Sequence, residues 1–284
     1  MNRATILFAA PDRSGLVARV SGFFADQGLN ILEASNYTDL HREGGARFYM
    51  RLVVDLGAAT TRATMEASFQ THIATPFGGE WSIGYDDRVA RVAVMVTKDP
   101  TCLYDLALRQ KQGELPCEIA LVISNHAALE GAAQSFRLPF YALPITKETK
   151  PEQEAQVLDL LKRHDVDLVV LARYMQVLSD DFLTKSPPVI NIHHGFLPAF
   201  QGAKPYHQAH ARGVKLIGAT AHYATKDLDE GPIIEQDVQR ITHAMGPDEL
   251  VRVGRDVERV VLARAVRAHL DRRVIVEGRR TFVL

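Results

Sequence analysis

The sequence predicts an α/β protein in which a ferredoxin-like α+β domain precedes a doubly wound domain with a mostly parallel sheet. Residues 4–85 follow the order β-α-β-β-α-β, which is the complete element order of a ferredoxin-like unit. From residue 89 onward, short apolar runs alternate with helical patterns, as in a parallel sheet wound by helices. The polar stretch GYDDR, residues 84–88, separates the two patterns. We therefore expect domains at residues 1–83 and 89–284, joined by a linker over 84–88.

The first half of the N-terminal domain shows strand, helix and strand patterns. A strand over Ala4–Ala10 leads through the turn DRSG into a helix whose apolar residues recur at helical spacing. These apolar residues are Leu16, Val20, Phe23 and Phe24. Gly28 ends the helix, and the pair Asn30–Ile31 begins a second strand that runs to about Tyr37.

The second half of this domain starts with a polar hairpin tip, TDLHREGG, at residues 38–45. Alternate residues are apolar from Arg47 to Leu56, which is typical of a half-buried strand. A helix is expected over Thr60–Thr75 and a last strand over Trp81–Tyr85. The apolar side of that helix consists of Met65, Phe69 and Ile73.

Strands and helices alternate through the second domain. Strands are expected over Val89–Thr97, Ile119–Ser124, Phe140–Leu143 and Val166–Leu171. Helices are expected over Cys102–Gln112, Ala127–Phe136, Pro151–His164 and Pro247–His269, and a hairpin over residues 274–284. The first of these helices is expected to bury Leu103, Leu106 and Leu108. The run Val166–Leu171 is strongly apolar, as expected for a strand that is buried on both faces.

Composition limits the function classes. With 46% hydrophobic and 24% charged residues, the chain is typical of a globular protein. A net charge of −1 argues against a nucleic-acid partner, and no apolar run approaches the roughly 18 residues of a membrane span. The two cysteines, Cys102 and Cys117, have no metal-binding or redox spacing. Reduced thiols favour a cytoplasmic location.

The candidate site is organised around the segment VINIHHGFLPAFQG, residues 189–202. Its β-branched residues follow two prolines and predict a strand, on which residues two apart point to the same face. Asn191 and His193 therefore share a face, whereas His194 points to the other and is assigned a supporting role. In open parallel sheets, ligands bind at the carboxyl ends of strands. The alternative is a strand end whose polar side chains bond to neighbouring backbone.

These two residue types suit the hydrolysis of an acyl group. Asn191 can donate to a developing oxyanion, a contact worth roughly 10²–10³ in rate. His193 can donate a second bond or transfer a proton, worth about 10²–10⁴. A base is also required, and the segment KDLDEGP offers Asp227, Asp229 and Glu230. Crowded carboxylates beside a partly desolvated pocket would have a raised pKa, although an isolated segment of this kind is more often a solvated loop.

Two other kinds of site are not expected. His207 and His210 lie three residues apart, but the chain has no HExxH pattern and no further ligands at suitable spacing for zinc. The turn after the first strand of the second domain, in VMVTKDPTCLYD, contains no glycine, whereas phosphate-binding turns are rich in glycine. We therefore predict neither a metal site nor a phosphate cradle there.

Three segments together resemble the folate-dependent formyltransferase superfamily. They are VVLARYMQVLS from residue 169, NIHHGFLPAFQGAKPYHQAHARGVKLIGATAHY from residue 191, and LDEGPIIEQD from residue 228. The N-terminal DRSGLVARVS and the pair Asn30–Ile31 are similar to those of ACT domains. The resemblance covers essentially the whole chain. It implies a formyltransferase-like catalytic domain that follows an ACT-type regulatory domain.

The resemblance also assigns residues to roles. It implies that Asn191, His193 and Asp229 are catalytic, so that Asp229 is selected from the three carboxylates. It implies a pterin pocket formed largely by backbone groups of Met175, Gln176, Val177, Leu178, Ala224 and Thr225. For the ACT-type domain it implies a homo-oligomer and an amino-acid effector near Asp12, Gly15, Asn30 and Ile31. The alternative is that this domain only holds the oligomer together.

The implied reaction is the hydrolysis of 10-formyltetrahydrofolate to formate and tetrahydrofolate, by attack of water on the formyl carbonyl. Folate is then the substrate, no metal or redox cofactor is needed, and the protein belongs to one-carbon metabolism and purine biosynthesis. The alternatives are formyl transfer to an amine acceptor and a catalytically silent, folate-binding regulatory protein. Gly195, where the family usually has Ser, and Thr101, where relatives often have His, depart from the pattern.

Overall fold

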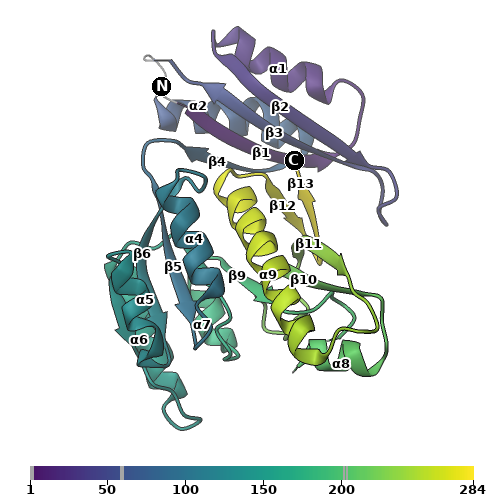
Figure 1. The fold of residues 1–284 in the computed structure, drawn as a ribbon. Helices are drawn as coiled ribbons and strands as arrows, with labels where there is room; N and C mark the ends of the chain where they lie inside the picture. Colours follow the sequence, from purple (N-terminus) through teal and green to yellow (C-terminus); the bar gives the residue numbers. More distant parts are fainter. Residues whose placement is uncertain (1–2, 58–60, 201, 203) are drawn as a thin grey trace. The chain divides into compact units, whose positions relative to one another are not determined.

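The computed structural model describes residues 3–57, 61–200, 202 and 204–284 (Figure 1). The chain divides into two compact units. The first contains Met1–Val89 together with Arg272–Ile275 and Phe282–Leu284, and the second contains Ala90–Asp271 and Val276–Thr281. The C-terminal segment, assigned wholly to the second domain on sequence grounds, thus contributes to both units. The division falls after Val89, and the first two residues of the expected linker lie in a strand.

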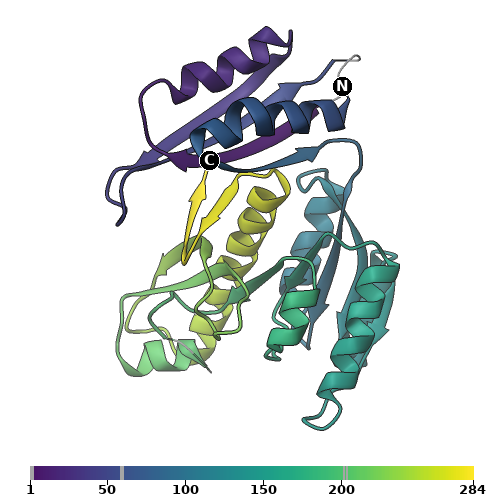
Figure 2. The same cartoon turned by 180° about the vertical axis from the view of Figure 1, so that it is seen from behind.

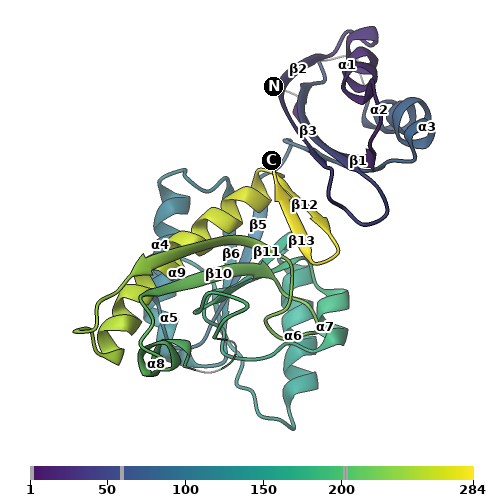
Figure 3. The same cartoon turned by 90° about the vertical axis from the view of Figure 1, so that its right-hand side faces the viewer.

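The first unit is a four-stranded antiparallel sheet in the order β2-β3-β1-β4, with its helices on one face (Figure 3). Its strands are β1 (Arg3–Pro11), β2 (Asn30–Asp39), β3 (Arg47–Asp55) and β4 (Glu80–Tyr85). Its helices are α1 (Leu16–Asp26), α2 (Arg62–Phe69), the π-helical η1 (Gln70–Ala74) and α3 (Thr75–Phe77). The predicted ferredoxin-like order is confirmed. Thr60, the expected start of the second helix, lies outside the described residues.

Helical spacing and strand alternation both identified core residues of this unit, but alternation did not predict that the second face of β3 is covered. The apolar residues expected to line α1 and the second helix are all buried. The half-buried pattern expected for β3 is wrong, because Tyr49 is 0% and Arg51 5% exposed on its second face. Phe282 stacks on Tyr49 with ring centroids 4.1 Å apart, and Arg51 donates to the Arg272 carbonyl at 3.1 Å. The alternation of apolar residues along β3 could not predict this burial, because the residues that cover the second face come from the C-terminal segment.

The second unit contains a seven-stranded sheet in the order β11-β10-β9-β8-β5-β6-β7. The strands are β5 (Ala90–Val96), β6 (Cys117–Ser124), β7 (Phe140–Ala142), β8 (Leu168–Leu171), β9 (Val189–His193), β10 (Leu216–Tyr223) and β11 (Ile233–Arg240). The strands from β9 to β7 are parallel, and β10 and β11 pair antiparallel. The expectation of a doubly wound, mostly parallel sheet is confirmed.

Helices cover both faces of this sheet (Figures 2 and 3). One face carries α4 (Thr101–Lys111), η2 (Ala127–Leu129), α5 (Glu130–Ser135) and α9 (Pro247–Leu270); the other carries α6 (Lys150–Arg163) and α7 (Asp180–Lys185). The remaining elements are α8 (Pro205–Ala211) and the hairpin strands β12 (Val274–Glu277) and β13 (Arg280–Val283). The expected burial of Leu108 is wrong, since it is 50% exposed and α4 buries Cys102 and Ala107 instead.

The winding of the chain reverses between β5 and β8. The chain forms β5, β6 and β7 toward one edge and then returns to β8 and β9 on the other side of β5. In open α/β sheets, ligands bind in the crevice at the carboxyl ends of the strands where this reversal occurs. The loops that follow the two strands meet there, because the Met175 N–H donates to Thr97 Oγ1 at 3.0 Å.

Among the helices of the described residues, none has both the length and the apolar character that crossing a membrane requires.

Candidate active site

A cavity of about 260 Å³ lies at the carboxyl ends of the central strands of the second unit. All six predicted pterin-pocket residues line it: Met175, Gln176, Val177, Leu178, Ala224 and Thr225. The predicted catalytic residues Asn191, His193 and Asp229 line it as well. Met175 and Val177 are 55% and 52% exposed, so they present apolar side chains at an accessible wall that suits a flat ring.

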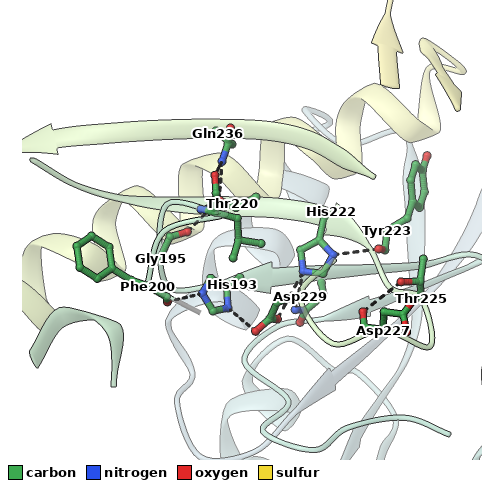
Figure 4. A network of polar contacts seen from close by, with 12 residues as sticks. His193, Gly195, Phe200, Thr220, His222, Tyr223, Thr225, Asp227, Asp229 and Gln236 are labelled. Atoms are coloured by element: carbon green, nitrogen blue, oxygen red, sulfur yellow. Dashed lines mark hydrogen bonds and ion pairs between the residues drawn. The ribbon is translucent and has the colours of Figure 1, made fainter. Parts of the chain in front are cut away.

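His193 is the last residue of β9, and its ring lies between two acceptors (Figure 4). Its Nδ1 is 3.3 Å from Asp229 Oδ2, and its Nε2 is 3.2 Å from the Phe200 carbonyl oxygen. A carbonyl and an ionised carboxylate can only accept, so the ring can donate to both only when it carries a hydrogen on each nitrogen. The ring lies at the wall of the cavity.

Asp229 lies on the loop that follows β10, with a left-handed φ of 57°. Partial burial alone would raise its pKa, but the hydrogen bond from His193 and the charge of His193 outweigh this effect. The pKa is therefore lowered from its ordinary value of 3.8, and Asp229 is ionised at neutral pH. The expectation of a raised pKa in this segment is wrong. The other two acids do not crowd Asp229, since Asp227 is exposed and Glu230 pairs with Arg279 at 2.9 Å.

His222, on β10, is a further site residue that was not predicted. The antiparallel register places it opposite Asn191. Its Nδ1 donates to the Tyr223 carbonyl at 2.9 Å, so that Nε2 of the neutral ring accepts from Asn191 Nδ2 at 3.2 Å. Burial lowers the pKa of His222 and favours this neutral form. The contact orients the amide of Asn191. The sequence GATAHY contained a signal for this role, because Thr220 and His222 are polar residues two apart on a strand and therefore point to the same face.

Gly195 has little free space around it. A Cβ there would lie 2.9 Å from His193 Nε2 and 3.2 Å from the Phe200 oxygen, so glycine leaves room for the contact between them. The Thr220 hydroxyl donates to the Gly195 carbonyl at 2.9 Å and accepts from the Leu197 N–H at 3.0 Å (Figure 4). The departure from the family's usual Ser therefore lies directly beside His193, the histidine that is predicted to be catalytic.

The other histidines considered on sequence grounds have different surroundings. His194 is half-buried, lines the cavity, and has its ring centroid 6.2 Å from that of Tyr206. Burial, helped by the charge of Arg173, lowers the pKa of His194 to about 4. His207 and His210 are exposed on α8. Within residues 3–57, 61–200, 202 and 204–284, no three His, Cys, Asp or Glu side chains are grouped to hold a metal ion.

The predicted effector residues all lie in the first unit. Gly15 has a φ of 87° and immediately precedes α1, and Asp12 is exposed with its N–H bonded to the Ala46 carbonyl. Asn30 is exposed at the start of β2, and Ile31 beside it is partly buried. Their role in effector binding stays a prediction.

Comparisons with known proteins agree with this geometry. A family model described as Formyl transferase matches residues 90–266, and one described as ACT domain matches residues 4–67. The chain is thus a formyl transferase-type catalytic unit joined to an ACT domain. The formyltetrahydrofolate deformylase of Synechocystis sp. is 49% identical over 280 residues, covering 99% of this chain and 98% of that protein. The chain belongs to the formyltetrahydrofolate deformylase family.

Some solved structures match the whole chain, and others match about 70% of it. The formyltetrahydrofolate deformylase of Pseudomonas syringae pv. tomato superimposes with a TM-score of 0.93 at 44% identity, covering 100% of this chain and 95% of that one. Glycinamide ribonucleotide transformylase 1 of Symbiobacterium toebii matches with a TM-score of 0.66 at 30% identity, covering 70% of this chain and 96% of that one. The formyl transferase fold is therefore shared with proteins that are named for a different acceptor.

Proposed function

We propose that this protein hydrolyses 10-formyltetrahydrofolate to formate and tetrahydrofolate. The main support is the meeting of Asn191, His193 and Asp229 in one cavity, in a chain that belongs to the deformylase family. Both loops that would hold the pterin line that cavity. The cavity therefore offers polar side chains for the formyl group and two loops for the pterin ring.

Each side chain has a distinct task in the mechanism. Asp229 orients a water and accepts its proton as the water oxygen attacks the formyl carbon. The carbonyl oxygen becomes an oxyanion, which the Asn191 amide N–H and the positive His193 ring stabilise. The intermediate then collapses, the bond between the formyl carbon and N10 breaks, and N10 takes up the proton held by Asp229.

The low pKa of Asp229 suits the second half of this cycle. A carboxyl group that ionises readily is a weak base but a strong acid, so it returns its proton easily to the leaving nitrogen. The attack step then depends on the neighbouring imidazolium, which stabilises the oxyanion as it forms. In this mechanism the folate is the substrate, and no metal or redox group takes part.

Formyl transfer to an amine is the second candidate, since glycinamide ribonucleotide transformylase 1 shares the fold of the second unit. The turn between β5 and α4 disfavours it. This turn has no glycine, and the side chain of Asp99 accepts the N–H of Thr101 at 3.0 Å. Binding of a phosphorylated acceptor at such a turn would require free backbone N–H groups. Water is therefore the favoured acceptor.

The proposal includes regulation and location. The ACT unit is proposed to bind an amino-acid effector near Asp12, Gly15, Asn30 and Ile31 and to pair copies of the chain in a homo-oligomer. A cytoplasmic location is supported by Cys102 and Cys117, which are free, buried thiols. The proposed partners are thus folate, an effector and further copies of the chain, with neither nucleic acid nor membrane.

One assay tests the reaction. Purified protein is incubated with 10-formyltetrahydrofolate without any amine, and formate and tetrahydrofolate are measured. Equal amounts of the two products are expected. Turnover that requires an added amine would establish a transferase instead, and folate binding without any turnover would establish the regulatory alternative.

A further inference from the structure

The turn between β5 and α4 carries a partly buried carboxylate at the reversal point of the sheet. The side chain of Asp99 is 13% exposed. Its Oδ1 accepts the Thr101 N–H at 3.0 Å, while its Oδ2 lies 3.0 Å from Arg255 Nε and 3.7 Å from Arg173 Nε. Hydrogen bonding to Thr101 and the charges of the two arginines outweigh the effect of burial and lower the pKa of Asp99, so it is ionised.

The partners of Asp99 come from three parts of the chain, and the first of them, Thr101, begins α4. Arg173 follows β8 and lines the catalytic cavity, whereas Arg255 comes from α9. Arg173 is also paired with Glu258, which is 0% exposed, lies 2.8 Å away, and accepts from the Tyr206 hydroxyl at 2.7 Å. Both guanidinium groups are therefore engaged by the protein's own carboxylates.

This cluster lies where a doubly wound sheet ordinarily receives an anionic ligand. Open α/β sheets bind ligands at the carboxyl ends of the strands where the winding reverses, and phosphates favour cationic side chains there. Here β5 and β8 are those strands, and the loops that follow them contribute Asp99 and Arg173. The position thus has two arginine side chains, and the carboxylate of Asp99 already occupies the place of an anionic ligand between them.

We propose that Asp99 is a specificity-determining residue. Its carboxylate occupies the anion position beside the folate cavity, so a phosphorylated amine is repelled and water is left as the formyl acceptor. This inference rests on the proposed hydrolysis and deepens it. It gives a physical reason why a chain that shares its fold with a glycinamide ribonucleotide transformylase would not use a ribonucleotide acceptor.

The test measures the binding of inorganic phosphate to the full-length protein by titration calorimetry, with no folate present. In Asp99→Ser the hydroxyl can still accept the Thr101 N–H, while the charge and most of the side-chain volume are removed. Phosphate is expected to bind this variant roughly tenfold or more tighter than wild type, because a like charge a few ångströms away has been removed. Adding Arg255→Gln to Asp99→Ser should reverse the gain.

Asp105→Asn is the matched control. Asp105 also lies on α4 and is paired with Arg109 at 2.7 Å and Arg259 at 3.6 Å, so the variant changes net charge equally at a different place. If Asp99→Ser does not fold, Asp99→Asn, which keeps the side-chain shape, is expected to show a smaller gain in the same direction.

Wild-type protein that binds phosphate as tightly as Asp99→Ser would overturn the proposal. An equal gain in Asp105→Asn, or no gain in folded Asp99 variants, would do the same. The proposed function fails separately, through wild-type protein that does not release formate, because phosphate binding is measured without turnover.

Discussion

At the residue scale, the position of Asp229 gives the sharpest test of the mechanism. Asp229→Asn keeps the shape of the side chain but removes its charge and its capacity to accept a proton. We expect turnover to fall by about 10²–10⁴, the usual worth of a positioned acid–base group. Folate should still bind, because the two loops that line the pocket are unchanged. Formate release gives the rate, and titration with a non-hydrolysable folate analogue gives the affinity.

Asp227→Asn is the control for this change, since Asp227 also lines the cavity but its side chain is exposed. It should retain most of the activity. An active Asp229→Asn enzyme would show that the base is a different group.

His194 gives a prediction about pH and stability. Its pKa is lowered from 6.5 to about 4 in the folded protein by burial. As pH falls below 6.5, the unfolded chain takes up a proton that the folded protein does not accept until about pH 4. Stability is therefore lost as pH falls, by at most about 2 kcal/mol at pH 5 for this group. His194→Gln should show a smaller loss between pH 7 and pH 5 in denaturant unfolding. Equal losses in the two proteins would mean that His194 titrates normally when folded.

At the scale of elements, helix α9 packs closely against α8 at a glycine. A Cβ on Gly254 would lie 2.1 Å from Tyr206 Cζ, and Tyr206 is held in place by its bond to buried Glu258. Gly254→Ala should therefore destabilise the protein by about 1–3 kcal/mol through overpacking, although alanine is otherwise the better helix former. Denaturant unfolding measures the change.

Gly22, inside α1, is the matched control, because nothing lies within 4 Å of a Cβ added there. Gly22→Ala should stabilise the protein by about 0.5–1 kcal/mol. Similar effects of the two substitutions would refute the close approach of α8 and α9.

Elements with a clear periodicity could be predicted from the sequence, and short ones could not. The apolar positions of α1 and the extent of the long helix α9 could be predicted because helical spacing repeats over several turns. Helix α7 has only 6 residues, too few for a period, although Ser179 accepts the Phe182 N–H as a typical N-cap. The π-helical turn over Gln70–Ala74 interrupts what appeared in the sequence as one continuous helix.

The candidate site could likewise be predicted only where its geometry depends on local sequence. That Asn191 and His193 lie on one face follows from the two-residue period of a strand. The partners of these residues depend on how distant segments pair. His222 reaches Asn191 only through the antiparallel register of β9 and β10, and register is not fixed by local sequence. The approach of Asp229 to His193 rested on family resemblance until the structure gave the distance.

At the scale of the whole molecule, the first unit is built from both ends of the chain. Phe282→Ala removes the ring that stacks on Tyr49, whose own side chain is fully buried on β3. We expect a loss of roughly 2–4 kcal/mol in the stability of this unit, from lost apolar cover and lost ring stacking. Phe282→Leu should restore most of the cover without the stacking. Unchanged unfolding of Phe282→Ala would show that the C-terminal segment does not complete the β3 face.

The shared C-terminal segment also sets an order of events during synthesis. A ribosome makes β3 early, but it makes Arg272–Ile275 and Phe282–Leu284 only after residues Ala90–Asp271 of the second unit. Until then the Tyr49 ring lacks Phe282, and the Arg51 guanidinium lacks the Arg272 carbonyl. The first unit, although most of it precedes the second in the sequence, is therefore completed after it. A nascent chain that stalls before Phe282 therefore lacks the cover of Tyr49 on β3.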